Sequence, residues 1–151
     1  MRELNPVYGS VQDGLERGLE WLKRPLLYVM GVSYAVAGVL HFVVPELYAQ
    51  IIPPFLPFPL VLVYLSGIAE MALGIGVMVP RTRRLAAWGL IALLLAIFPA
   101  NIYMATNGVV VEGAGMVLDP SPAERWGRLP LQGVLMLWAW WYTRSPPADS
   151  L

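Results

Sequence analysis

The chain alternates between long apolar runs and shorter polar stretches. Four apolar runs stand out, at about residues 25–44, 60–79, 85–106 and 129–143. A helix needs about 20 apolar residues to cross a 30 Å hydrocarbon core, and the first three runs reach that length. The fourth is shorter and ends in aromatic residues typical of a membrane interface. Because backbone amides in lipid must bond within their own segment, the pattern predicts an all-α membrane protein, a four-transmembrane-helix bundle spanning residues 25–144.

Residues 1–24 show a different pattern. Val11, Leu15, Leu19 and Leu22 recur at spacings of four, four and three, with charged residues between them. This is the pattern of an amphipathic helix that lies in the membrane interface. We expect it to turn at Pro25 into the first span. At the other end, residues 145–151 are expected to form a disordered tail.

Two longer loops separate the spans. Residues 45–59 are rich in proline, which forbids a regular helix from Pro53 onward. We expect a short helix near Glu46–Ile52, followed by an extended lid that carries aromatic residues. The lid residues are Tyr48, Phe55 and Phe58. In the second loop, at residues 107–128, a small hairpin is expected around Glu112–Gly115.

The basic residues predict the orientation of the chain. Arg125 and Arg128 lie between the third and fourth runs, and the remaining eight of the ten lie at the opposite ends of the runs. Those eight are Arg2, Arg17, Lys23, Arg24, Arg81, Arg83, Arg84 and Arg144. Cytoplasmic loops carry the excess of Lys and Arg, so both termini are expected in the cytoplasm of a cell whose membrane the chain crosses several times.

Composition narrows the chemistry. Hydrophobic residues make up 58% of the chain and charged residues 13%, which leaves too little polar surface for a soluble domain. The formal net charge is zero, so nothing indicates a nucleic-acid partner. The chain has no cysteine and one histidine, which excludes disulfides and thiolate chemistry and argues against a metal site.

Glu70 is the most informative polar residue in the runs. It lies near the predicted bilayer midplane, where an unpartnered ionisable group costs about 2.5–3.5 kcal/mol on insertion scales, so it should face the other helices. Gly67 and Gly74 share its helical face. Two interpretations stay open: Glu70 anchors a ligand or handles a proton, or it is buried for packing specificity.

Other polar residues fall at similar depth, in the half of the bundle that faces outward. They predict a ligand-binding cavity of about 300–1,000 Å³, although the same residues could instead hold the helices together. The candidate residues are Glu70, His41, Asn101, Tyr34, Tyr64, Ser66 and Gln132. Helix rise should separate His41 from Glu70 by about 8–15 Å in depth, so no catalytic residue is assigned and a non-catalytic role is favoured.

Several segments resemble a known family. They are AGVLHFVVPELYAQIIPPFLPFP, SGIAEMALGIGVMVPRTRRLAAWG, FPANIYMA and RLPLQGVLMLWAWWYTR. Together they resemble the DoxX and DoxX-like family of small four-helix membrane proteins, over about residues 28–144. The resemblance implies a four-helix bundle with cytoplasmic termini, a prokaryotic cytoplasmic membrane and a link to quinone-dependent redox systems.

Two functions remain as alternatives. In the first, the chain binds a small apolar or quinone-like ligand, or a lipid, as an accessory of a membrane redox system. In the second, it is a non-catalytic chaperone or adaptor that recognises another membrane protein, or a further copy of itself, through the lid and its lipid-facing aromatics. A transporter is least favoured, because no discontinuous helix pair or inverted repeat is visible.

Overall fold

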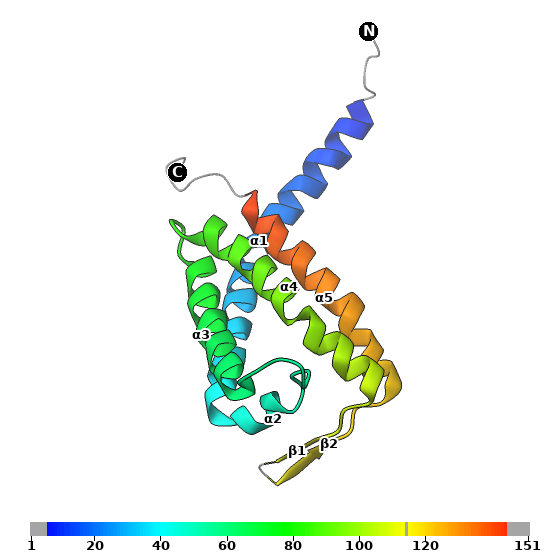
Figure 1. The fold of residues 1–151 in the computed structure, drawn as a ribbon. Helices are drawn as coiled ribbons and strands as arrows, with labels where there is room; N and C mark the ends of the chain where they lie inside the picture. Colours follow the sequence, from blue (N-terminus) through cyan, green and yellow to red (C-terminus); the bar gives the residue numbers. More distant parts are fainter. Residues whose placement is uncertain (1–5, 114, 145–151) are drawn as a thin grey trace.

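The computed structural model describes residues 6–113 and 115–144. Helices dominate: α1 (Pro6–Val43), α2 (Pro45–Ala49), α3 (Pro59–Met78), α4 (Arg83–Asn107) and α5 (Pro122–Thr143) (Figure 1). Between α4 and α5 lie two short strands, β1 (Val111–Gly113) and β2 (Met116–Leu118). The expected tail at 145–151 and the first five residues of the expected interfacial helix lie outside the described residues.

Three helices are long and apolar enough to cross a membrane. They are the Trp21–Val43 part of α1, α3 and α4. The predicted spans at 60–79 and 85–106 therefore agree closely with the structure, and the chain is a mostly helical membrane protein. Among the described residues α5 does not reach the same hydropathy, because its Trp, Tyr, Pro and Gln side chains are less apolar than Leu or Ile.

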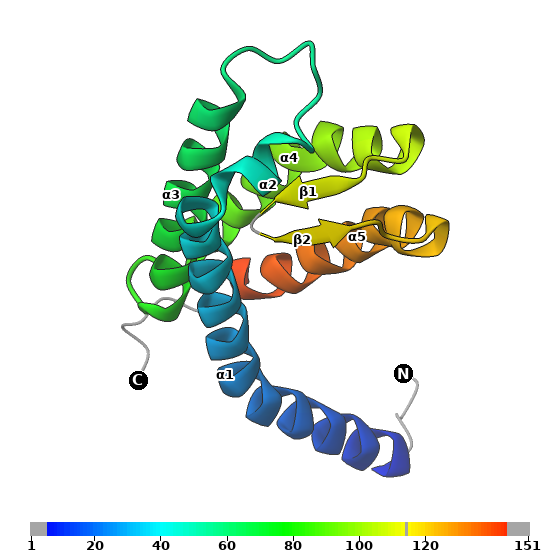
Figure 2. The same ribbon diagram turned by 90° about the horizontal axis from the view of Figure 1, so that it is seen from below.

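Helix α1 differs from the expected pair of segments. It runs without interruption from Pro6 to Val43, with Pro25 inside it. A proline in a helix removes one hydrogen bond and bends the helix rather than always ending it. Figure 2 shows the two halves of α1 running in different directions. The segment before Pro25 and the first span thus form one continuous helix that changes direction (Figure 2), and the place of the first segment in the membrane interface stays a prediction.

The helices form two hairpin-like pairs, α1 with α3 and α4 with α5. The two pairs also meet through α3 and α4, which are joined by a tight turn at Val79–Thr82. Figure 1 shows the pairs diverging from this turn, so the molecule is a wedge. We call the narrow side the turn end. The broad side, with α2, β1 and β2, is the hairpin end.

Glycines bring α1 and α3 into close contact. A Cβ atom on Gly38 would lie 2.6 Å from the carbonyl oxygen of Gly67, and one on Gly74 would lie 2.6 Å from that of Gly31. Only hydrogen fits at such distances. Small residues in contacting faces are what allow membrane helices to pack backbone against backbone.

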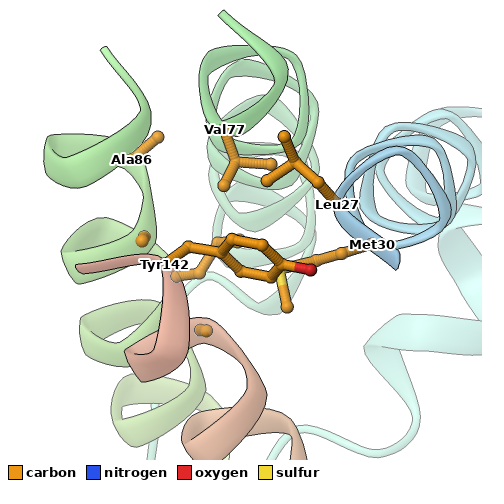
Figure 3. Close-up of a cluster of buried hydrophobic side chains, with 8 residues drawn as sticks. Leu27, Met30, Val77, Ala86 and Tyr142 are labelled. Carbon is orange, nitrogen blue, oxygen red and sulfur yellow. The ribbon is translucent and has the colours of Figure 1, made fainter. Parts of the chain in front are cut away.

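A buried hydrophobic cluster closes the turn end. Its side chains come from all four long helices, including Leu27, Met30, Val77, Ala86 and Tyr142 (Figure 3). Tyr142 is 1% exposed. Its hydroxyl donates a hydrogen bond of 3.0 Å to the backbone carbonyl of Lys23. Tyr142 therefore connects α5 to α1, although these two helices belong to different pairs.

Two side-chain hydrogen bonds tie the parts of the hairpin end together. The Gln50 amide, just after α2, donates to the Glu112 carbonyl at 2.8 Å and accepts from the Glu112 backbone N–H at 3.0 Å. The expected hairpin is confirmed: β1 and β2 are antiparallel, with Val111 opposite Leu118 and Gly113 opposite Met116. α2 (Pro45–Ala49) agrees with the short helix expected near Glu46–Ile52, although it ends three residues earlier.

Helix α5 begins earlier than the apolar run at 129–143. Its first residue is Pro122, after a capping box in which the Ser121 hydroxyl accepts from the Glu124 N–H and the Glu124 carboxylate accepts from the Ser121 N–H. The Ser121 hydroxyl also donates to the Glu124 carboxylate at 2.7 Å, and this hydrogen bond, followed by the one from the Ser121 N–H, holds the pKa of Glu124 below its usual value. The Ser-Pro-Ala-Glu sequence carries this start signal, which hydropathy does not register.

Candidate functional site

A cavity of about 580 Å³ lies between the two helix pairs toward the hairpin end. Its wall is mostly aliphatic and comes from α3, α4 and the segment that follows α2. Six side chains with polar atoms contribute to the wall: His41, Tyr48, Ser66, Glu70, Asn101 and Arg128. The volume and this composition are those of a small-molecule site, which is apolar with a few polar groups.

Glu70 faces the other helices, as expected. It is 7% exposed and lies on the α3 face that also carries Gly67 and Gly74. Both glycines contact α1 closely, so the carboxyl lies beside a tight helix contact and reaches the cavity wall. Among the described residues, none donates a hydrogen bond to its Oε2 atom, which is buried. A buried acceptor without a partner is rare in folded proteins.

His41 and Glu70 are neighbours, so the expected separation of about 8–15 Å is wrong. Nδ1 of His41 lies 3.6 Å from Oε2 of Glu70. The reason is that α3 extends beyond the end of α1: Phe42, next to the end of α1, stacks on Tyr64, one turn into α3. Side chains in a helix lean toward its N-terminus, which brings the Glu70 carboxyl closer still to His41.

The His41 ring has fixed surroundings. Its Nδ1 is 2.8 Å from the Ala37 carbonyl, which can only accept, so Nδ1 carries a proton and donates. The ring also stacks on Tyr48, with 3.8 Å between the ring centres. Burial, and next the charge of Glu70, raise the pKa of the Tyr48 hydroxyl above its usual value. His41, Tyr48 and Glu70 thus form one cluster at the cavity wall.

The cover of the cavity is aliphatic rather than aromatic. Phe55 and Phe58 are each 75% exposed and do not line the cavity, so two of the three expected lid residues lie away from it. Ile51, Ile52 and Leu56 take their place. Pro53, which is fully buried, anchors the segment from inside. In a bent, proline-rich segment, the residue types alone do not show which side chains face the cavity. For this reason the sequence does not indicate that Phe55 and Phe58 face away from it.

Asn101 and Gln132 form a link between α4 and α5. The Asn101 amide donates to Oε1 of Gln132 at 2.8 Å, and the Gln132 amide donates to the Leu94 carbonyl. Asn101 lines the cavity, whereas Gln132 is 2% exposed and does not. Pro99 frees the Leu95 carbonyl by removing an N–H, but Gln132 uses the carbonyl one residue earlier. Gln132 therefore links α4 to α5 and is not part of the cavity wall.

Two further candidate residues lie outside the wall. Tyr34 is partly buried against the hydrophobic cluster, on the side of His41 that faces the turn end. Its hydroxyl is buried without a hydrogen-bond partner among the described residues. Tyr64 is 38% exposed and contacts Phe42 on the outside of the α1–α3 pair. Ser66 does line the cavity, and its hydroxyl donates to the Val63 carbonyl at 2.9 Å.

Arg128 is a wall residue that the sequence analysis placed in a loop. It lies one helical turn before Gln132 in α5 and brings a positive charge to the α5 side of the cavity. Recognising the capping box at Ser121 would have placed it in the helix. Within residues 6–113 and 115–144, no three His, Asp or Glu side chains gather as metal ligands would.

Comparison with known families gives one match. The family model described as "Domain of unknown function (DUF8561)" matches residues 30–143, which include α2, α3, α4, the whole of α5 and the part of α1 that carries His41. The matched segment contains every residue of the cavity wall. No curated protein matches the chain. No solved structure matches it either.

Proposed function

Since the chain belongs to this family, whose description assigns no activity, we propose a function from the cavity: the protein binds a small lipophilic molecule within the membrane. The observation that carries this proposal is the cavity of about 580 Å³ with His41 and Glu70 at its wall. Interhelical hydrogen bonds in membranes average about 0.6 kcal/mol, which is too little to explain a buried carboxyl by stability alone.

The proposal includes a topology of four spans with both termini in the cytoplasm. α5 has 22 residues and packs along α4, and at a rise of 1.5 Å per residue it is about 33 Å long. Arg81, Arg83 and Arg84 lie at the turn end, which the excess of positive charge assigns to the cytoplasm. The cavity and α2 then lie toward the outer face, in the cytoplasmic membrane of a prokaryotic cell.

This topology predicts the labelling of single cysteines, which is simple because the natural chain has none. Arg81→Cys at the turn end and Glu112→Cys in β1 both replace exposed residues. In intact cells, a membrane-impermeant maleimide should label Glu112→Cys and label Arg81→Cys only after the membrane is permeabilised. The reverse pattern would show that the topology is inverted. Labelling of both variants in intact cells would contradict a bundle in which residues 81 and 112 lie on opposite sides of the membrane.

The ligand we propose is a quinone-like molecule or a lipid with a small polar head. The aliphatic wall accommodates an apolar body, and His41, Glu70 and Asn101 provide hydrogen-bonding atoms for the head. The resemblance to DoxX-like proteins supports a role as an accessory of a membrane redox system. The short distance between His41 and Glu70 removes the distance argument against acid–base chemistry, but the function proposed here is binding.

A cavity-filling variant tests this function. Ala69 lines the cavity and Ala72, on the same helix, is exposed, so Ala69→Phe and Ala72→Phe add the same side chain to different faces. Mass spectrometry of organic extracts from the purified proteins should detect a lipophile with wild type and Ala72→Phe, and at least tenfold less with Ala69→Phe. Equal amounts of the same molecule in all three, or none in any, would contradict binding in the cavity.

A second candidate function is that of an adaptor for another membrane protein. Its specific support is the exposure of Phe55 and Phe58, each 75%, on the segment between α2 and α3. A partner recognised in this way would be lost from pull-downs with Phe55→Ala and Phe58→Ala together. The same partner would be retained with Ala69→Phe, which separates this function from ligand binding.

A further inference from the structure

On the α1–α3 side of the cavity, the donor atoms of His41 and Ser66 have hydrogen-bond partners, whereas an acceptor atom of Glu70 has none. Here α1 and α3 contribute three hydrogen-bonding side chains to the described wall, His41, Ser66 and Glu70, and α2 adds the hydroxyl of Tyr48. His41 donates its Nδ1 proton to the Ala37 carbonyl, and Ser66 donates its hydroxyl proton to the Val63 carbonyl. Both of these protons are therefore used within the protein, and the hydroxyl of Tyr48, whose ring stacks on His41, is the donor that remains at this wall.

The atoms of His41, Ser66 and Glu70 that remain unpaired accept hydrogen bonds. A neutral imidazole whose Nδ1 donates has an accepting Nε2, and a serine hydroxyl that donates keeps two lone pairs. The strongest acceptor is Glu70, since its Oε2 atom is buried and has no hydrogen-bond partner among the described residues. Only 7% of Glu70 is exposed to solvent. Leaving such an atom unpaired is costly.

From this we propose that the ligand of the cavity is a lipophile whose polar head donates a hydrogen bond to Glu70, such as a phenol or an alcohol. A molecule with acceptors alone, such as a ketone or an ether, would leave the carboxylate form of Glu70 unpaired and add acceptors beside it. Sites that hydrogen-bond a hydroxyl discriminate strongly against analogues that lack it, because the buried partner is then unsatisfied. This inference rests on the proposed function and specifies its ligand.

The opposite wall is compatible with such a head. Asn101 uses one amide proton on Gln132 and keeps its Oδ1 acceptor and a second N–H, while Arg128 brings donors from α5. A hydroxyl can donate toward Glu70 and accept from this side at the same time. A cationic amine would satisfy Glu70 too, but it would share the cavity with the Arg128 guanidinium.

A matched pair of probes tests the inference. 4-Octylphenol and its methyl ether, 4-octylanisole, have nearly the same shape and apolar area, and only the phenol donates. Binding to the purified full chain in detergent can be followed by the quenching of tryptophan fluorescence or by calorimetry. We expect the phenol to bind at least tenfold more tightly than the ether, and Ala69→Phe to weaken both.

Variants at two carboxyls assign the preference to Glu70. Glu70→Gln replaces one acceptor oxygen with a donor, so it should reduce the preference for the phenol to less than threefold. Glu46→Gln makes the same change at an exposed carboxyl of α2 outside the cavity wall and should leave the preference intact. If Glu70→Gln does not fold, the wild-type preference alone decides.

The outcomes separate this inference from the function on which it rests. Equal binding of both probes, or tighter binding of the ether, would overturn the proposal that the ligand donates a hydrogen bond to Glu70. Either result would still support a site for a lipophile. Binding of neither probe, together with no extracted lipophile, would overturn both. A preference for the phenol that survives Glu70→Gln would place the acceptor on another residue and would also overturn the proposal.

Discussion

Replacing Gly38 with alanine is expected to destabilise the protein by about 3 kcal/mol, the upper part of the usual range for overpacking. A Cβ atom there would lie 2.6 Å from the Gly67 carbonyl oxygen and 2.9 Å from the Met71 backbone nitrogen. Because both are backbone atoms, no side-chain rotation relieves the clash, and α1 must move away from α3. Thermal unfolding in detergent would show this as a large fall in Tm.

Gly133→Ala is the matched control for this change. Gly133 lies in α5, and a Cβ atom there would meet nothing within 4 Å. Alanine is favoured over glycine in a helix by about 1 kcal/mol, so the variant should be as stable as wild type or more so. If Gly38→Ala unfolds at the same temperature as Gly133→Ala, the close contact between α1 and α3 is not present.

The second large effect is expected at Tyr142. Tyr142→Ala should cost about 3–5 kcal/mol, the range for removing a buried aromatic ring, because the ring is 1% exposed and packs in the cluster that closes the turn end. Tyr142→Phe keeps the ring and loses only the hydrogen bond to the Lys23 carbonyl. That change should cost about 1 kcal/mol.

Unfolding in detergent at increasing denaturant concentration would measure both Tyr142 variants. The difference between them reports the packing of the ring separately from its hydroxyl. Equal losses for Tyr142→Ala and Tyr142→Phe would show that the hydrogen bond, and not the cluster, joins α5 to α1. No loss for either would contradict the closed turn end.

The spans at 60–79 and 85–106 were predictable because the signal is local. Lipid requires each crossing segment to satisfy its own backbone and to be apolar along its length, so a sum over neighbouring residues finds α3 and α4 to within two residues. The orientation of Glu70 was predictable for a related reason. A carboxyl between two glycines on one helical face has only one favourable direction, toward other helices.

The pairing of helices was not predictable in this way. Whether His41 lies near Glu70 depends on how far α3 extends past the end of α1, and the proline-rich connection decides this. An estimate of depth made along each helix separately does not include this offset between α1 and α3. Similarly, hydropathy placed Arg128 in a loop, whereas the Ser121 capping box extends α5 outward and brings Arg128 to the cavity.

The Gln50 amide has a consequence for contacts between copies of the chain. A two-stranded ribbon leaves a row of unpaired N–H and C=O groups on each side, where another strand can add. At Glu112 both backbone groups on the outer side of β1 are already bonded to Gln50, which acts there as a one-residue substitute for a third strand. The ribbon is thereby protected on that side against β-sheet aggregation, and strand addition is directed to β2.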